Sequence, residues 1–561
     1  MFKNPDITIY YLKNGVKCSA KSSCDSFDVT YSYENGRMCL AVEPKETVTL
    51  CQAFVKVNYA FPADVRVMPN GYQSWTLTRE YKKGEKYESY IKLADITPFT
   101  KNFATVSGDA FFRPYPDKAN LFHGFTYAYL RCGNEYTLIG SLSERAGYTV
   151  LNFDLNTNTI TVEKDLEGKV IGEKTVLCDV AVFCGAHDAV FDAYFDAMGI
   201  APCKSPRICG YTSWYNYYTN ISEAIAVRDM NALERTGAAI NVFQIDDGYQ
   251  TMVGDWQTCN EKFPKGMKFI ADSVHAKGWK AGLWLAPFYA QKKSKVALAH
   301  PDWILKDASG KPVFGMLGTR PCYTLDFYIP ACAEYIKGFF NTILNEWGFD
   351  LVKLDFLYNA CTVPRNGKSR GEIMCDAMDF LRECVGEKLI LGCGVPLGPA
   401  FGKVDYCRIG SDVDLTFKPR FGNLMVAREL VSTQTALQNT VFRRGLNGRA
   451  FGNDPDVFYL RGLNNESSGS KKALAFTIGQ KLLWAQVCRD FGSILFTSDN
   501  AANYNAAQKR ILMETYTASA RKIQDVFYEG KNLLKVFFEE NGENKVWFIN
   551  YVTGENHIEN R

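Results

Sequence analysis

Carboxylates that could do chemistry occur at three places in this chain, each close to an apolar run, and at two of them a basic side chain accompanies the acid. The residues are Asp246 and Asp247, Lys353 with Asp355, and Arg408 with Asp412. A carboxylate beside a buried strand loses hydration and costs free energy unless it is paired, so it needs a functional or a structural reason. Two carboxylates at one site suit glycoside hydrolysis. One can attack the anomeric carbon while the other protonates the leaving oxygen and later activates water.

Each of these segments also has a structural interpretation. Adjacent acids can cap a helix, a lysine two residues from an aspartate can form a structural ion pair, and an arginine can neutralise a buried acid. Asp412 competes with Asp405 and Asp414 for a catalytic role, and Trp284 could belong to the core. The functional interpretation therefore depends on whether the fold brings these residues to one face.

A repeated unit of helix, glycine and apolar strand occurs four times after Arg207 and supplies such a face. The predicted helices cover 222–236, 267–277, 331–347 and a segment ending at 386, and the predicted strands cover 240–245, 279–287, 350–356 and 388–393. A further strand is expected at 404–412. Such alternation predicts a parallel sheet covered by helices.

Over roughly 300 residues this alternation favours a (β/α)₈ barrel, with a doubly wound open sheet as the alternative. The open sheet is the weaker choice because no G-x-G-x-x-G or phosphate-binding loop accompanies the strands. A barrel carries its site at the C-terminal ends of its strands, where the acids above are found. The strand period of two puts Lys353 and Asp355 on one face, so Lys353 is the expected partner that keeps Asp355 ionised.

Both ends of the chain have the patterns of antiparallel sheets. Hairpin signals occur at Asn35-Gly36, at 156–158 and at Asn541-Gly542, each between alternating apolar and polar residues. We therefore expect a multidomain protein of β and α/β parts. Its predicted parts are an N-terminal β-sandwich (1–200), a catalytic (β/α)₈ TIM barrel (201–515) and a small C-terminal β domain (516–561).

The composition excludes several classes of protein. The chain has 561 residues, of which 47% are hydrophobic and 22% charged, with a formal net charge of +3. This balance gives no reason to expect nucleic acid or an anionic membrane as partner. The N-terminus has no apolar signal segment and no apolar run could span a bilayer, so a cytoplasmic location is expected. The 18 cysteines include no C-x-x-C pair, and only 5 histidines occur, so we expect no disulfide framework, metal or cofactor.

Taken in order, these motifs resemble those of glycoside hydrolase family 36, in the clan that it shares with family 27. The clan contains α-galactosidases and α-N-acetylgalactosaminidases. The resemblance covers roughly 207–500, and the N-terminal part more loosely. It implies a β-supersandwich, a (β/α)₈ barrel and a C-terminal β domain, with retaining hydrolysis of α-galactosides from oligosaccharides.

The resemblance also implies roles for individual residues. The family's K-x-D matches 353–355 and makes Asp355 the nucleophile, and the clan's R-x-x-x-D matches 408–412 and makes Asp412 the general acid/base. That spacing is why Asp412 is preferred to its neighbours. Asp246 and Asp247 would hold the galactose 4- and 6-hydroxyls.

The remaining matches would line the sugar pocket. Lys353 would hold the 3- and 4-hydroxyls, and Arg408 the 2-hydroxyl side. Trp214 ends a G-[WY]-x-x-W motif, Trp284 takes the third-strand aromatic position, and Asp456 ends an N-D-P-D motif. The segment 70–75 resembles a sandwich loop that reaches the barrel mouth in some relatives.

One segment departs from the family pattern and leaves the substrate open. Many members have C-S-x-G-G after the fifth strand, whereas this chain has Cys393-Gly394-Val395-Pro396. Because that segment contacts the 2-position substituent, an α-N-acetylgalactosaminidase is an alternative. A galactosyl transglycosidase and a non-catalytic sugar-binding protein on the same scaffold are further alternatives. The resemblance also suggests a homo-oligomer.

Overall fold

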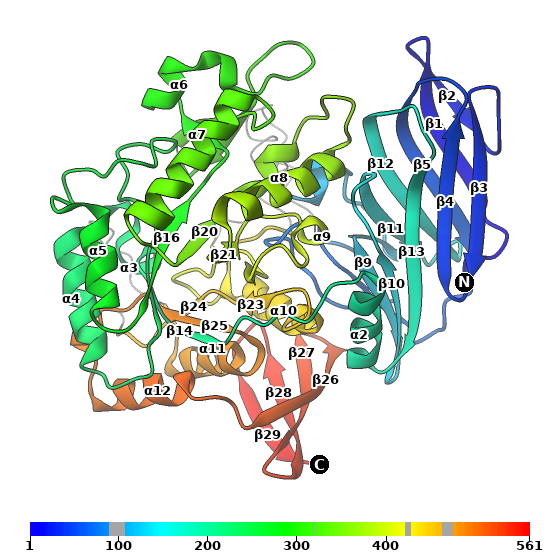
Figure 1. The fold of residues 1–561 in the computed structure, drawn as a ribbon. Coiled ribbons are helices and arrows are strands. Elements are labelled where there is room, and N and C mark those ends of the chain that lie inside the picture. The colour runs from blue at the N-terminus through cyan, green and yellow to red at the C-terminus, as the bar shows by residue number, and fades with distance from the viewer. Residues whose placement is uncertain (89–106, 319, 421–427, 463–474) are drawn as a thin grey trace.

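The computed structural model describes residues 1–88, 107–318, 320–420, 428–462 and 475–561 (Figure 1). An antiparallel sandwich forms the N-terminal part, a parallel barrel the centre and a four-stranded antiparallel sheet the C-terminal part. The sandwich and the barrel lie side by side, and the C-terminal sheet packs beneath them in the view of Figure 1. The predicted fold class is therefore confirmed.

The sandwich has a six-stranded sheet, ordered β2-β1-β5-β12-β11-β8, and a seven-stranded sheet, ordered β3-β4-β13-β10-β9-β6-β7. The strands are β1 Asp6–Lys13, β2 Val16–Ala20, β3 Phe27–Glu34, β4 Arg37–Pro44, β5 Val48–Asn58, β6 Arg66–Pro69, β7 Tyr81–Lys82, β8 Leu121–Phe125, β9 Tyr127–Cys132, β10 Glu135–Ser141, β11 Tyr148–Asp154, β12 Thr159–Ile171 and β13 Thr175–Gly185. Alternate residues point between the sheets, so Leu40 and Val42 of β4 are buried with Val55 of β5. The predicted Asn35-Gly36 hairpin joins β3 to β4, and both of its residues have positive φ, as a tight hairpin turn requires.

The barrel consists of parallel strands that close into a ring. The strands are β14 Ile208–Thr212, β15 Val242–Ile245, β16 Lys280–Leu285, β20 Leu351–Leu354, β21 Leu389–Gly392, β22 Tyr406–Arg408, β23 Gly452–Asp454, β24 Val457–Phe458 and β25 Ile494–Thr497. Pro455 and Asp456 interrupt one strand position and split it into β23 and β24. Since β22 pairs with β23, β24 with β25, and β25 with β14, eight strand positions close the barrel.

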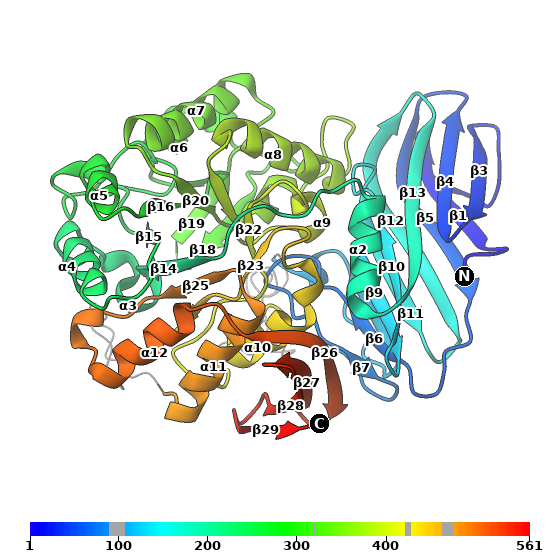
Figure 2. The same cartoon turned by 60° about the horizontal axis from the view of Figure 1, so that its bottom comes forward.

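Helices follow the strands and surround them (Figure 2). They are α3 Trp214–Tyr217, α4 Glu223–Glu234, α5 Gly266–His275, α6 Lys295–Ala299, α7 Pro330–Asn341, α8 Arg370–Val385, α9 Leu397–Ala400, α10 Thr433–Phe442, α11 Ile478–Phe491 and α12 Ala506–Tyr516. The side chains of Ser222 and Ser369 accept hydrogen bonds from backbone N–H groups in the first turns of α4 and α8. The predicted helices and strands between 222 and 393 are confirmed with ends shifted by a few residues.

One predicted strand is wrong in length. The expected strand at 404–412 shortens to β22, Tyr406–Arg408, because the chain then turns into a loop. Asp412 lies in that loop. Beyond β22, Asp412 accepts a hydrogen bond from Arg408, and the backbone N–H of Val413 donates to the Asp456 carboxylate.

A hairpin, an extra helix and the C-terminal sheet complete the fold. After β16, the strands β17 Tyr289–Gln291, β18 Phe314–Leu317 and β19 Arg320–Thr324 form a small antiparallel sheet. The helix α2 His187–Ala197 lies between sandwich and barrel. The C-terminal strands are β26 Arg521–Gly530, β27 Leu533–Glu540, β28 Glu543–Asn550 and β29 Asn556–Asn560. Among the described residues, no helix is both long and apolar enough to cross a membrane.

Candidate active site

The acids singled out by the sequence lie at the C-terminal ends of the barrel strands. Asp246 follows β15, Asp355 follows β20 and Asp412 lies four residues beyond the end of β22. Side chains that point into a barrel from alternate strands meet in layers. Because β15 and β20 both pair with β16, they are alternate strands whose inward side chains come together.

Asp246 is held from several directions. Its Oδ2 accepts hydrogen bonds from Lys353 Nζ at 2.9 Å, Gln244 Nε2 at 3.1 Å and Thr212 Oγ1 at 3.4 Å. The backbone N–H of Asp247 donates to Asp246 Oδ1 at 2.9 Å. Both members of the Lys353–Asp246 pair are buried. A buried pair with additional hydrogen bonds fixes the position of its carboxylate.

Asp247 is paired with an arginine from the hairpin that follows β16. Both guanidinium Nη atoms of Arg320 donate to the Asp247 carboxylate, one to each oxygen. Gln250 Nε2 also donates to Asp247 Oδ1, at 2.7 Å. A two-point arginine contact fixes the plane of a carboxylate as well as its position. The pair of adjacent acids is therefore anchored on two sides, Asp246 by Lys353 and Asp247 by Arg320.

Asp355 lies in an enclosed position, with 8% of its surface exposed. The indole Nε1 of Trp284 donates to Asp355 Oδ2 at 3.0 Å, and the backbone N–H of Phe356 donates to Oδ1 at 2.8 Å. Phe356 has a left-handed backbone conformation (φ 56°), which is unusual for a bulky residue and directs its N–H at the carboxylate. Both oxygens of Asp355 therefore have fixed donors.

The pKa of Asp355 is raised above its usual value, and burial is the main cause. The charge of Lys353 and the hydrogen bond from Trp284 oppose this rise, and the negative charge of Asp412 adds to it. The influence of Asp412 indicates that the two carboxylates are close enough to interact. Lys353 and Trp284 thus favour the ionised form that a nucleophile requires.

The expectation that Lys353 pairs directly with Asp355 is wrong, because its Nζ donates to Asp246. The strand period predicts a shared face but does not predict which acid across the barrel interior is nearest. Burial disfavours the charged form of Lys353, but nearby acids, Asp246 above all, outweigh it and raise its pKa. Lys353 therefore stays positively charged. Although its hydrogen bond goes to Asp246, its charge lowers the pKa of Asp355.

Arg408, the last residue of β22, connects Asp412 to Asp456. Its Nη2 donates to Asp412 Oδ1 and to Asp456 Oδ2, both at 2.9 Å, and its side chain is 1% exposed. Asp456 Oδ2 also accepts from the hydroxyl of Tyr215 and from the backbone N–H of Val413. Burial raises the pKa of Asp456 to about 7, against the opposing charge of Arg408. Because Asp456 Oδ2 has several protein donors, Asp456 serves to hold Arg408 and the loop that carries Asp412.

Asp405 and Asp414, the alternatives to Asp412 for a catalytic role, bind to other partners. Asp405 precedes β22, at the opposite end of the strand, and accepts from Arg382 and from the N–H of Ile390. Asp414 pairs with Arg420 at 2.9 Å and accepts from the backbone N–H of Leu415. Asp412 has 40% of its side chain exposed, so it is the one of the three that combines an arginine neighbour at the mouth with access to solvent.

The three tryptophans of this region differ in their surroundings. Trp284 is buried, bonds to Asp355 and packs edge-on against Trp256, with ring centroids 5.7 Å apart. Trp214 is partly buried just after β14 and packs edge-on against Tyr218 at 5.1 Å. The structure therefore places Trp284 directly beside Asp355, and Trp214 just beyond the end of β14.

A loop of the sandwich reaches the barrel mouth, as the resemblance suggested. The indole Nε1 of Trp75 donates to Cys393 Sγ at 3.4 Å, and the ring packs edge-on against Phe356 at 5.2 Å. Gly394 has φ 54°, and a Cβ placed there would come within 2.8 Å of the Trp75 ring. Cys393 is 1% exposed, and burial raises the pKa of its thiol. Trp75 therefore fills the space beside Cys393 and Gly394.

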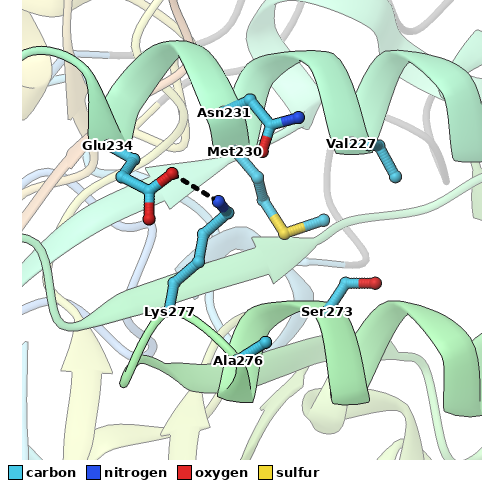
Figure 3. A pocket seen from close by; sticks show the side chains of 7 residues that line it. All are labelled: Val227, Met230, Asn231, Glu234, Ser273, Ala276 and Lys277. Carbon is cyan, nitrogen blue, oxygen red and sulfur yellow. Dashed lines mark hydrogen bonds and ion pairs between the residues drawn. The ribbon is translucent and has the colours of Figure 1, made fainter.

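One groove elsewhere on the barrel lacks the paired acids of this mouth. The groove between α4 and α5 (Figure 3) has a single acid, Glu234, which pairs with Lys277 at 2.7 Å. That groove lies on the outside of the barrel, away from the strand ends. No cluster of histidine, cysteine and carboxylate side chains in the described parts of the chain has the arrangement of a metal site.

Sequence reasoning missed several residues of the site. Gln244 lies two residues before Asp246 on the same strand face, so the strand period could have found it. Arg320 is 73 residues from Asp247, and no local pattern connects them. Tyr215 likewise reaches Asp456 across 241 residues.

Comparison with known proteins agrees with this architecture. The Melibiase family model matches residues 212–376. The α-galactosidase of Escherichia coli is 29% identical over 166 residues, which are 28% of this chain and 23% of that enzyme. A galactosaminidase of Flavonifractor plautii, named for α-D-galactosamine of blood type A, is 30% identical over 138 residues, which are 22% of this chain and 12% of that protein. The matched segments thus span less than a quarter of these curated relatives.

Solved structures match over almost the whole chain. The α-galactosidase of Thermus thermophilus, in complex with p-nitrophenyl α-D-galactopyranoside, aligns with a TM-score of 0.69 and 25% identity over 96% of this chain and 98% of that one. A family 36 α-galactosidase of Geobacillus stearothermophilus shares the fold, with a TM-score of 0.62 and 14% identity over 97% of this chain and 75% of that one. The order of the motifs, the family model over residues 212–376 and the full-length similarity to the Thermus thermophilus enzyme together support assignment of the chain to glycoside hydrolase family 36.

Proposed function

We propose that this protein is a retaining α-galactosidase that releases terminal α-linked galactose from oligosaccharides by double displacement. The observation that carries the proposal is the pair Asp355 and Asp412 at one barrel mouth. One acid is enclosed and fixed, and the other is exposed and held by one arginine. The α-galactosidases among the relatives and structural neighbours support this substrate class.

In the first step, a carboxylate oxygen of Asp355 attacks the anomeric carbon of galactose. The bond from that carbon to the glycosidic oxygen breaks, and Asp412 donates its proton to the departing oxygen. In the second step, Asp412 takes a proton from water, the water oxygen attacks the anomeric carbon, and the ester bond to Asp355 breaks. Two displacements return the sugar to its original configuration.

The degree of exposure of each acid suits its proposed role. A nucleophile gains from a fixed position, because reacting atoms must approach in line over a short distance. Trp284 and the N–H of Phe356 supply that position for Asp355. A general acid/base must reach both a leaving group and water, and the 40% exposure of Asp412 allows this.

The anchored acids Asp246 and Asp247 are suited to recognising hydroxyl groups of the sugar. Ionised carboxylates accept strong, directional hydrogen bonds from hydroxyls, and Lys353 and Arg320 keep both in place. A sugar that lacks a hydroxyl in the required direction would leave these buried acids badly paired. Sites of this kind discriminate strongly against such analogues.

The space beside Cys393 supports galactose over N-acetylgalactosamine. The resemblance assigns this segment to the 2-position substituent, and here the Trp75 ring already occupies the space next to Gly394. A hydroxyl is small enough for such a site, whereas an acetamido group would have to displace the ring. The galactosaminidase relative makes the second sugar the natural comparison.

The test is the initial rate on p-nitrophenyl α-galactoside and on p-nitrophenyl α-N-acetylgalactosaminide, for the wild type and for Asp355→Asn. We expect turnover of the galactoside, a much lower kcat/KM for the acetamido sugar, and loss of both activities in the variant. A preference for the acetamido sugar would keep the mechanism and change the substrate. Failure to hydrolyse either glycoside would contradict the proposal and favour a sugar-binding protein.

A further inference from the structure

Arg443, just beyond α10, is a fully buried cation whose described contacts include no carboxylate. Its Nε donates to Asn70 Oδ1 at 3.1 Å, and its Nη2 to the carbonyl of Gln73 at 3.1 Å. Its Nη1 donates to the carbonyls of Ser74 at 2.6 Å and Ile409 at 3.0 Å. Burial lowers the pKa of Arg443 to about 10. A buried cation without an acid partner costs free energy, so its position calls for a reason.

The four acceptors belong to two elements of the candidate site. Three are in the sandwich loop that carries Trp75, and the fourth is the carbonyl of the residue that follows Arg408. A planar guanidinium with five N–H groups in fixed directions can hold several carbonyls in one arrangement, which a flexible ammonium cannot do. Arg443 therefore ties the loop to the end of β22, beside the arginine that holds Asp412.

The rest of the loop is joined to the barrel next to Trp75. The N–H of Ser74 donates to the carbonyl of Val395 at 2.9 Å, and the N–H of Thr78 donates to Asn439 Oδ1 at 2.6 Å. These contacts leave the Trp75 ring beside Cys393 and Phe356, the latter directly after Asp355. Contacts from barrel residues therefore fix the position of Trp75, a side chain of the sandwich.

We propose that Arg443 is a positioning residue that fixes Trp75 as one wall of the substrate site. The inference rests on the proposed glycosidase function and deepens it, because it assigns the placement of the wall to a single buried side chain. Arg443 touches no reacting atom. Its loss would loosen Trp75, weaken contacts that substrate and transition state share, and so raise KM more than it lowers kcat.

The experiment compares Arg443→Met with Trp75→Ala, the double variant and a matched control, Arg444→Met. Arg444 is the next residue, has 9% of its side chain exposed, and bonds to Asp525, Tyr136 and the carbonyl of Val441, away from the loop. On p-nitrophenyl α-galactoside, Arg443→Met should raise KM about tenfold and change kcat by less than about threefold. The double variant should be no worse than the poorer single variant, because both changes remove one wall. Arg444→Met should keep the wild-type KM.

A second measurement follows the environment of Trp75 by fluorescence and does not require catalysis. The Trp75→Phe substitution is made in the wild type and in Arg443→Met, and the fluorescence lost in each case is the emission of Trp75. In Arg443→Met this emission should move to longer wavelength, because the Trp75 ring becomes more exposed to water. If Arg443→Met does not fold, Arg443→Lys replaces it, since lysine keeps the charge but cannot hold four acceptors. Unchanged Trp75 emission, or additive losses in the double variant, would overturn the proposal. A wild type inactive on both aryl glycosides would instead overturn the proposed function, and the emission would still test Arg443.

Discussion

The two carboxylates of the candidate site are held in different ways. Asp355 directly follows β20, has 8% of its surface exposed and receives hydrogen bonds from an indole and a backbone N–H. Asp412 lies in a loop beyond β22, has 40% of its side chain exposed and is held by Arg408. The strand end supplies a rigid position, whereas the loop supplies access to water and to a leaving group. This difference supports the proposed roles of Asp355 as nucleophile and Asp412 as general acid/base.

The largest effect is expected from removing the nucleophile. Asp355→Asn should lower kcat by about 10⁴-fold or more, because an amide cannot form the covalent intermediate. The amide has the same shape and its oxygen can still accept from Trp284, so the melting temperature should stay within a few degrees, about 3 °C, of the wild type. Initial rates and thermal unfolding measure the two quantities. A variant that retains a tenth of the wild-type rate would contradict the assignment.

Removing the exposed acid should have a smaller effect that depends on the leaving group. Asp412→Ala should lower kcat by about 10²- to 10⁴-fold on an oligosaccharide, whose leaving oxygen needs a proton. The loss should be smaller on p-nitrophenyl α-galactoside, since nitrophenolate leaves readily without one. The matched control is Asp414→Asn, two residues away and paired with Arg420, which should keep the ratio of the two rates unchanged. Equal losses on both substrates would argue against general acid catalysis by Asp412.

Breaking the pair at the strand ends should reduce both stability and activity. Lys353→Met leaves Asp246 as a buried charge without its cation, which should lower the free energy of unfolding by about 3 kcal/mol. It also removes a charge that favours the ionised form of Asp355, so kcat/KM should fall about 100-fold. Denaturant unfolding and initial rates measure these changes. The double variant Lys353→Met/Asp246→Asn should regain stability but not activity, and recovery of activity would contradict a role in the site.

The smallest expected effect is a shift in pH dependence. The raised pKa of Asp355 means that kcat/KM falls as pH falls through that pKa, because protonated Asp355 cannot attack. The hydrogen bond from Trp284 lowers this pKa, so Trp284→Phe should raise it further and move the acid limb to higher pH. Trp256→Phe is the control, since Trp256 packs on Trp284 without bonding to Asp355. An acid limb that shifts equally in both variants would show that packing, not the hydrogen bond, is responsible.

The fold could be predicted where local patterns repeat. The alternation of helix, glycine and apolar strand gave the barrel, and Asn35-Gly36 and Asn541-Gly542 gave hairpins that the structure contains. Turn residues and strand period act over a few positions, so one sequence contains them in full. The strand expected at 404–412 failed because side-chain contacts to Arg408 and Asp456, not a continuing ladder, hold the loop after β22.

The site could be predicted only in part. The predicted strand ends located Asp246, Lys353 and Asp355 correctly. Which acid lies nearest to Lys353 depends on which strands face one another across the barrel interior, and the pattern within a single strand does not show this. Arg320 and Arg443 act across 73 and 373 residues, respectively, and both contacts depend on how separate elements pack. Such contacts have no period in the sequence.

The most direct test of the central claim is to trap the intermediate. The enzyme would be incubated with a fluorinated α-galactosyl fluoride, whose fluorine slows release of the sugar, then quenched in acid, digested and analysed by mass spectrometry. The double-displacement account predicts one added sugar on the peptide that contains Asp355, and none on the same peptide of Asp355→Asn. A sugar attached at Asp412, or steady hydrolysis of that fluoride with no labelled peptide and inverted product, would contradict it.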